Sequence, residues 1–150
     1  MPRFRRYYLA GHPVFVTLVT HGRNPWLADE ASVRVLLASM RSVNAIYRYS
    51  HLAHVVLPDH FHWLFKPDDV AHLSKIIAAE KRDVTWRFKT LASLPGPWWQ
   101  NRFYDHIVRD QDDFARHLDY IHFNPVKHGI ARNPGAYSYS SFHEWRRRGA

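Results

Sequence analysis

The sequence predicts one α+β domain with an antiparallel sheet and its long helices packed on one face. Three observations support this: extended runs alternate with segments of helical periodicity, two of these runs are separated only by Pro58-Asp59, and 150 residues suit one domain. Hydrophobic residues form 46% of the chain, enough for a core. We expect this core within residues 12–125, followed by a mostly irregular basic tail at 126–150.

The first half of the chain predicts a strand, a helix and a hairpin. The segment Val14 to Thr20 is β-branched and apolar, as is typical of a strand. Apolar residues then recur at helical spacing from Glu30 to Tyr49. Residues 51–57 and the run that begins at His60 resemble strands, and Pro58-Asp59 is too short for a crossover, so we expect an antiparallel hairpin.

The second half adds a helix over residues 73–88, an extended stretch over 98–108, and a third helix that begins near Asp110 and ends at Pro125. The order is strand, helix, strand, strand, helix, strand, which is the ferredoxin-like or RRM-like plan. The third helix is an addition to that plan at the C-terminal side. One face of the sheet would remain available for a ligand.

The composition excludes several kinds of site. The chain has no cysteine, so disulfides, thiolate zinc sites and cysteine nucleophiles are excluded, and a cytoplasmic location is the simplest expectation. No long apolar run follows the basic first residues, and no stretch approaches the roughly 20 apolar residues that cross a bilayer.

The charge favours a polyanionic partner, because the net charge is +8 and the isoelectric point is about 10. Aromatic residues among or near the basic ones can stack on unpaired bases, namely Trp86, Trp98, Trp99, Phe103 and Tyr104. Solubility charge with core aromatics is the alternative. The basic residues expected to contact DNA are Arg3, Arg5, Arg6, Lys81, Arg82, Arg102, Arg146, Arg147 and Arg148.

The run His60-Phe61-His62 is the most informative motif. Side chains alternate along a strand, so the two imidazoles project from one face, roughly 7 Å apart, while Phe61, Trp63 and Phe65 project from the other. Two imidazoles so placed can bind one metal ion. The alternative is a pair of surface histidines.

A second group of polar residues lies on the third helix. Tyr120 and Asn124 are four residues apart and share a helical face, and Arg116 and His117 lie about one turn earlier. A tyrosine can act as a covalent nucleophile, and the Asn124 carbonyl oxygen can be a third metal ligand. The alternatives are a packing tyrosine and an asparagine that caps the helix.

Taken together, two motifs resemble the HUH single-tyrosine transposase family, and within it the REP-associated tyrosine transposases. The first motif is Pro58-Asp59-His60-Phe61-His62-Trp63-Leu64, and the second, about 60 residues later, is Tyr120-Ile121-His122-Phe123-Asn124-Pro125-Val126. The segments Trp99 to Asp105 and Tyr139-Ser140-Ser141 are similar to that branch in order and spacing.

This resemblance implies a divalent ion, Mg²⁺ or Mn²⁺, on His60, His62 and Asn124, with Tyr120 as the nucleophile and His117 and Arg116 in support. Members of the family cut single-stranded DNA beside palindromic hairpins, form a 5′-phosphotyrosine link and transfer the strand. Histidine pairs favour softer ions than magnesium, so we expect manganese to work at least as well.

Two other functions remain open on the sequence. One is a noncatalytic RRM-like nucleic-acid-binding domain, although the open sheet face would carry histidines where an RRM carries aromatic residues. The other is a metal-dependent nuclease that uses water, although Asp59, Asp105 and Asp119 are dispersed. The active site could form within one chain or between two, and the protein could be a monomer or a homodimer.

Overall fold

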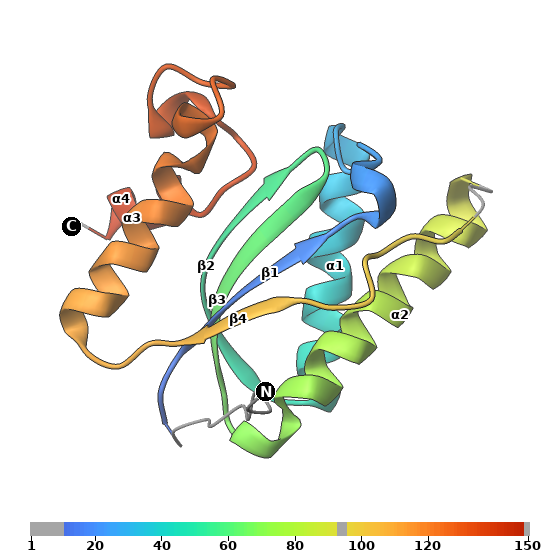
Figure 1. The fold of residues 1–150 in the computed structure, drawn as a ribbon, viewed down its shortest axis with the longest axis horizontal. Coiled ribbons are helices and arrows are strands. Elements are labelled where there is room, and N and C mark those ends of the chain that lie inside the picture. Colours follow the sequence, from blue (N-terminus) through green and yellow to red (C-terminus); the bar gives the residue numbers. More distant parts are fainter. Residues whose placement is uncertain (1–10, 93–95, 149–150) are drawn as a thin grey trace, which may run out of the picture.

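The computed structural model describes residues 11–92 and 96–148. Its strands and α-helices are β1 (Val14–Val19), α1 (Glu30–Ile46), β2 (Tyr49–Leu57), β3 (His60–Pro67), α2 (Leu73–Ala92), β4 (Tyr104–Ile107), α3 (Gln111–Lys127) and α4 (Phe142–Arg147). This order confirms the predicted α+β plan with an added tyrosine-bearing helix (Figure 1). Strand β4 is much shorter than the predicted extended stretch 98–108.

The sheet is antiparallel throughout, with the order β2-β3-β1-β4, and β2 and β3 form the predicted hairpin. Strands β1 and β3 are therefore central. In their register Val16 lies opposite Trp63 and Thr17 lies opposite His62. This register fixes which side chains share a face, because side chains alternate along each strand.

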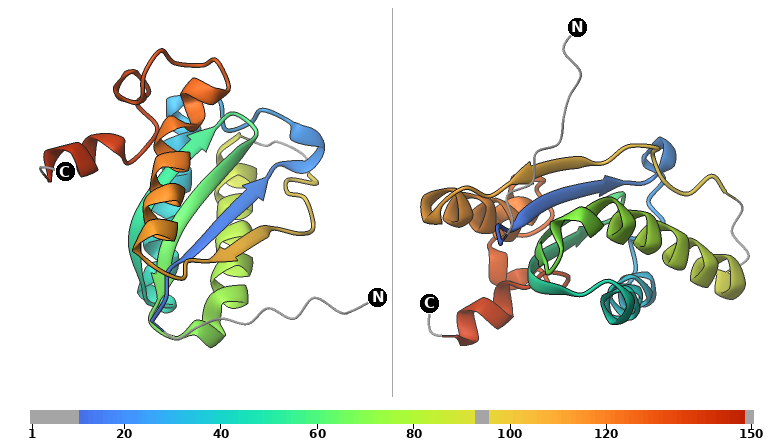
Figure 2. Two further views of the ribbon diagram at one scale, coloured as in Figure 1. Left: turned by 60° about the vertical axis from the view of Figure 1, so that its left-hand side comes forward. Right: turned by 90° about the horizontal axis from the view of Figure 1, so that it is seen from below.

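Helices α1 and α2 cover one face of the sheet, and α3 lies on the opposite face (Figures 1 and 2). Val16, Phe61 and Trp63 pack in the core under α1 and α2. On the other face Leu64 and Ile121 belong to a smaller core beneath α3. The central sheet is thus buried on both sides where α3 covers it, and a site can form beside this helix.

Helix α3 begins as predicted but does not end at Pro125. The Asp110 side chain caps it by accepting a hydrogen bond of 2.8 Å from the amide of Asp113. The predicted end was wrong, because the helix continues to Lys127. Pro125 lacks an amide donor and crowds the carbonyl one turn earlier, yet the helix runs only two residues past it. The Pro125 carbonyl accepts a hydrogen bond from the amide of Ile130 beyond the helix.

The segment after α3 is more ordered than the sequence predicts. Its residues pair with the free edge of β2: the Val56 amide donates to the carbonyl of Tyr139 at 2.8 Å, and the Ser141 amide donates to the carbonyl of His54 at 2.9 Å. Helix α4 follows directly. The tail therefore covers an edge strand that would otherwise expose unpaired backbone groups.

A buried polar network connects α3 to this edge. His122 Nε2 lies 2.9 Å from Ser141 Oγ, and Ser141 Oγ accepts a hydrogen bond from the amide of His54 at 3.0 Å. Burial lowers the pKa of His54 to about 3 and that of His122 to about 4. Both imidazoles are therefore neutral in the folded protein at neutral pH.

These values predict that the free energy of unfolding falls as the pH drops from 6.5 toward 4. The unfolded chain protonates its histidines near pH 6.5, whereas His54, His122 and the buried His62, whose pKa is about 3, stay neutral in the folded state. We expect a loss of more than about 1 kcal/mol per pH unit, measured by urea denaturation.

Glu80 provides a control for this prediction. Its burial raises its pKa well above the ordinary value, so this group alone would make the protein less stable as the pH rises above 4.5. The variant Glu80→Gln removes that opposing contribution and should steepen the rise in stability between pH 4.5 and 6.5. A stability that is flat across this interval in both proteins would contradict the buried histidine network.

Candidate active site

Strand β3 places the two histidines on the sheet face opposite α1 and α2. The ring centroids of His60 and His62 are 4.9 Å apart, and the residues are only 6% and 4% exposed. Phe61 between them packs in the α1/α2 core, as the alternation predicts. The predicted shared face is thus confirmed, and the alternative of two surface histidines is wrong.

Each imidazole is oriented by a hydrogen bond at Nδ1. Asp59 Oδ1 lies 2.7 Å from Nδ1 of His60, and Thr17 Oγ1 lies 2.7 Å from Nδ1 of His62. Thr17 reaches this position because it is the partner of His62 in the β1–β3 register. Such contacts direct Nε2 toward a ligand. Nε2 of His62 is buried and has no hydrogen-bond partner among the described residues.

Burial favours the neutral form of both imidazoles. Burial, together with the charges of His60, His128 and Lys127, lowers the pKa of His62 to about 3. Burial also lowers the pKa of His60, against an opposing effect of Asp59. A neutral imidazole is the form that coordinates a metal, so both rings can act as ligands at neutral pH.

Helix α3 brings Tyr120 and Asn124 to the same face. The Tyr120 ring centroid lies 5.1 Å from that of His62, and the residue is 40% exposed. Asn124 is 1% exposed, and its amide nitrogen and oxygen have no hydrogen-bond partner in the part of the chain that the structure describes. The tyrosine and the histidine pair therefore meet within one chain.

These unpartnered groups fit a metal ion. Buried polar groups nearly always have a hydrogen-bond partner. The unpartnered imidazole nitrogen on β3 and the unpartnered amide on α3 therefore need a physical explanation. A divalent ion bound by His60, His62 and Asn124 would satisfy them. Two nitrogen donors and one oxygen donor suit Mn²⁺ as well as they suit Mg²⁺. The residues present therefore fit the ion expected from the sequence.

A pocket of about 630 Å³ opens beside the tyrosine and the histidine pair. Its lining includes His60, His62, Tyr120, Arg23, Arg116 and His117. The Lys127 ammonium nitrogen lies 5.2 Å from the centroid of the Tyr120 ring. The cationic side chains beside Tyr120 and the two histidines favour a phosphate group in this pocket.

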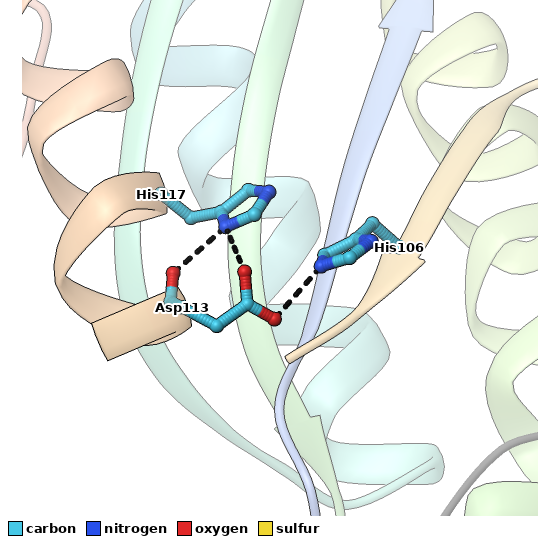
Figure 3. A group of neighbouring side chains, drawn as sticks. All are labelled: His106, Asp113 and His117. Carbon is cyan, nitrogen blue, oxygen red and sulfur yellow. Dashed lines mark hydrogen bonds and ion pairs between the residues drawn. The ribbon is translucent and has the colours of Figure 1, made fainter. Parts of the chain in front are cut away.

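The two supporting residues, His117 and Arg116, both contact Asp113. His117 Nδ1 lies 2.8 Å from the Asp113 carbonyl oxygen and 3.1 Å from its Oδ1, and Arg116 Nη2 lies 3.5 Å from the same Oδ1. Burial alone would raise the pKa of Asp113, but hydrogen bonds from the Arg109 amide and from His106 lower it to about 2. His106, Asp113 and His117 form a second cluster of possible metal ligands (Figure 3).

The residues expected to bind DNA lie in separate places. Arg3, Arg5 and Arg6 are outside the described residues. Lys81 and Arg82 belong to α2, on the sheet face away from the pocket, and Lys81 Nζ donates to the Gln100 carbonyl at 2.8 Å. The others are exposed, namely Arg102 before β4 and Arg146, Arg147 and Arg148 at the end of α4. None of these residues that the structure describes lines the pocket.

The aromatic residues expected to stack on bases differ in exposure and in position. Trp98 and Trp99 are only 8% and 9% exposed and pack against Trp26, so stacking on bases was wrong for both. Tyr104 is 58% exposed and lines the pocket, and it remains available. Trp86 is 65% exposed, but it lies on α2 in the helical layer away from the pocket.

The sequence reasoning missed the partners that orient the histidines and His117. The sequence could have indicated Thr17, because it is the one polar residue of β1. It could also have indicated Asp59, because this residue directly precedes His60. Asp113 lies in the first turn of α3, where an acidic residue favours the helix dipole, and the sequence indicates no further role for it. Its contact with His106 joins α3 to β4, and no local pattern predicts such a contact.

Comparisons with known proteins show which family the chain is similar to. The chain is 31% identical to the REP-associated tyrosine transposase of Escherichia coli K12, with 95% of the chain and 84% of the relative covered. A protein of Haemophilus influenzae with the same family name is also 31% identical, over 95% of this chain and 86% of the relative. A solved REP-associated tyrosine transposase bound to a REP hairpin matches with a TM-score of 0.79 and 30% identity, over 99% of this chain and 87% of that one.

No protein-family model matches the chain. Within residues 11–92 and 96–148, no helix combines the length and the apolar character that spanning a membrane requires.

The Thr17–His62 contact leads to a test of metal binding. The variant Thr17→Val keeps the side-chain volume but removes the hydroxyl that orients His62. We expect the affinity for Mn²⁺, measured by electron paramagnetic resonance of the free ion, to fall by about 10- to 100-fold.

Thr90→Val is the matched control, because the Thr90 hydroxyl only donates to the Trp86 carbonyl on α2. Its Mn²⁺ affinity should equal that of the wild type. Equal affinity in Thr17→Val would show that the hydroxyl does not position a metal ligand.

Proposed function

Because this chain belongs to the REP-associated tyrosine transposase family, we propose that it cleaves single-stranded DNA beside a hairpin and transfers the strand through a phosphotyrosine on Tyr120. The observation that carries the proposal is the contact of Tyr120 with His62, whose buried Nε2 is unpartnered within the described residues. We propose a hairpin as the substrate because the hairpin-bound relative matches nearly the whole chain.

The proposed reaction begins with the phenol. The Tyr120 oxygen attacks the scissile phosphorus and loses its proton, a P–O bond to the tyrosine forms, and the bond to the 3′-oxygen breaks. The 3′-oxygen leaves as a hydroxyl, and the 5′ side of the break stays on the tyrosine. Tyr120 is half-exposed beside the pocket, so the phenol is accessible to a strand.

Transfer reverses this step. A 3′-hydroxyl attacks the phosphotyrosine, the new P–O3′ bond forms, and Tyr120 regains a proton. The covalent link conserves the phosphodiester, so rejoining needs no nucleotide cofactor. His60, His62 and Asn124 would hold the divalent ion, which when bound supplies Lewis-acid polarisation of the phosphate and stabilises charge on the leaving oxygen.

The rim of the pocket supplies the remaining contacts in this proposal. Arg23 and Arg116 line the pocket and would bind the phosphate. His117 also lines it, and its Nδ1 is held by Asp113, so its Nε2 is available to exchange a proton with the phenol or the leaving hydroxyl. Proton transfer through His117 is part of the proposal.

The nucleophile is tested with a hairpin that carries a single-stranded extension. With Mn²⁺ the wild type should form a covalent protein–DNA adduct on a denaturing gel, and Tyr120→Phe should form none. His62→Ala should also lose the adduct while its hairpin affinity stays within a few fold.

Each other outcome points to a different function. Cleavage that persists in Tyr120→Phe would support a nuclease that uses water. Binding without cleavage in the wild type would support the nucleic-acid-binding domain. Tyr137→Phe is the matched control, since the Tyr137 hydroxyl donates to the Val56 carbonyl and should not affect the adduct.

The cluster at the end of α4 leads to a separate test of the hairpin footprint. The triple variant Arg146→Gln, Arg147→Gln and Arg148→Gln removes three exposed charges. We expect at least about tenfold weaker hairpin binding, with a salt slope reduced by roughly 0.7 to 0.9 for each phosphate that the protein no longer neutralises.

The matched control removes three exposed charges from the helical layer away from the pocket, as Arg41→Gln on α1 with Lys75→Gln and Lys89→Gln on α2. An equal loss of affinity in both triple variants would show only a general charge effect. That result would remove the α4 cluster from the proposed footprint.

A further inference from the structure

A second cluster of metal-binding side chains lies next to the proposed active site. It consists of His106 on β4 with Asp113 and His117 on α3, and their ligand atoms all lie within 4.8 Å of one another (Figure 3). Asp113 stands between the two imidazoles, with Oδ2 at 2.9 Å from His106 Nε2 and Oδ1 at 3.1 Å from His117 Nδ1.

The local structure explains why these three residues converge. Asp113 and His117 are four residues apart, so they share one face of α3 near its first turn. His106 reaches them from β4, and its ring stacks on that of His117 with centroids 4.4 Å apart and an interplanar angle of 14°. The Phe15 ring supports His117 from the sheet, at 5.0 Å between centroids.

We propose that His106, Asp113 and His117 form a second divalent-cation site, selective for a zinc-like ion and separate from the His60, His62 and Asn124 site. Two imidazoles and one carboxylate are a common zinc donor set, and they leave a fourth position for water. The third ligand here is a charged carboxylate, whereas in the His60, His62 and Asn124 group it is a neutral amide, and both sets have fewer oxygen donors than magnesium prefers. The ion would replace the present imidazole–carboxylate hydrogen bonds with coordination bonds.

The surroundings fit such a site. The Arg109 amide donates to Asp113 Oδ2 at 3.0 Å, which is the kind of contact that holds a ligating carboxylate in place. The side chains of His106 and His117 are 30% and 20% exposed, so an ion can reach them from solvent. Arg116 lies 3.5 Å from Asp113 Oδ1 and is 68% exposed, so it can turn away into solvent.

An ion at this site would connect β4 to the helix that carries Tyr120. The ligand His117 precedes Tyr120 by three residues and lines the same pocket. The bound ion would therefore stabilise the folded chain and fix the first half of α3 relative to the sheet. The ion would also coordinate His117 Nδ1, which now donates a hydrogen bond to the Asp113 carbonyl oxygen.

The test uses the variant His62→Ala, which disrupts the other site. We expect equilibrium dialysis at micromolar Zn²⁺ to find one zinc per His62→Ala chain, and Co²⁺ to give the intense visible absorption of a tetrahedral site. The double variant His62→Ala, His106→Ala should weaken zinc binding by more than about tenfold. The matched double variant His62→Ala, His72→Ala should still bind one zinc.

Circular dichroism of each variant shows whether it is folded, and Zn²⁺ should raise the melting temperature of His62→Ala but not of His62→Ala, His106→Ala. Absence of zinc from folded His62→Ala would overturn the proposal and leave the cluster as a hydrogen-bond network. Unchanged zinc binding after loss of His106 would overturn it too.

The result does not depend on strand transfer. Tyr120→Phe should bind zinc as the wild type does, whatever its effect on the covalent adduct. Zinc binding by Tyr120→Phe, measured by dialysis, therefore tests the second site even if Tyr120 is not the nucleophile. Failure of one proposal is thus distinguishable from failure of the other.

Discussion

The alternation of side chains along β3 is the constraint on which the rest of the site depends. Phe61 and Trp63 are fully buried in the core under α1 and α2, and their neighbours His60 and His62 consequently face α3. A slip of one residue against β1 would exchange the two sets and expose the aromatic rings. Exposing each ring would cost about 2 to 3 kcal/mol, so the core itself holds the histidines in register with Thr17.

Helix α3 must be held as firmly as the strand, because Tyr120 is half-exposed and cannot be positioned by its own burial. Its neighbours supply the constraint. Ile121 is fully buried in the smaller core, and His122 is tied to Ser141 at the β2 edge. Near the first turn of the helix, Asp113 binds His106 of β4. These contacts fix the phenol through the backbone and leave its oxygen accessible.

Local sequence patterns predicted only those features of the site that depend on residues close together in the chain. A His-x-His run on a strand fixes a shared face, and the four-residue spacing of Tyr120 and Asn124 fixes a shared side of a helix. The contact of Thr17 with His62 spans 45 residues and depends on strand register, which no local pattern contains. The pairing of the tail with β2 is likewise non-local. The continuation of α3 past Pro125 was missed because proline is an ambiguous signal in a last turn.

Arg23, a proposed phosphate-binding cation, and His60, a proposed metal ligand, are connected through Asp59. The Arg23 φ of 56° is in the left-handed region, which costs a side-chain-bearing residue on the order of 1 kcal/mol, and glycine would adopt this conformation more easily. An arginine there places a cation at the pocket, 3.4 Å from Asp59 Oδ2, while the other oxygen of Asp59 binds His60 Nδ1. Burial tends to raise the pKa of Asp59, but His60 and Arg23 together lower it, so the carboxylate stays charged. One ionised group therefore orients a proposed metal ligand and contacts a proposed phosphate-binding cation, and this links both to the turn between β2 and β3.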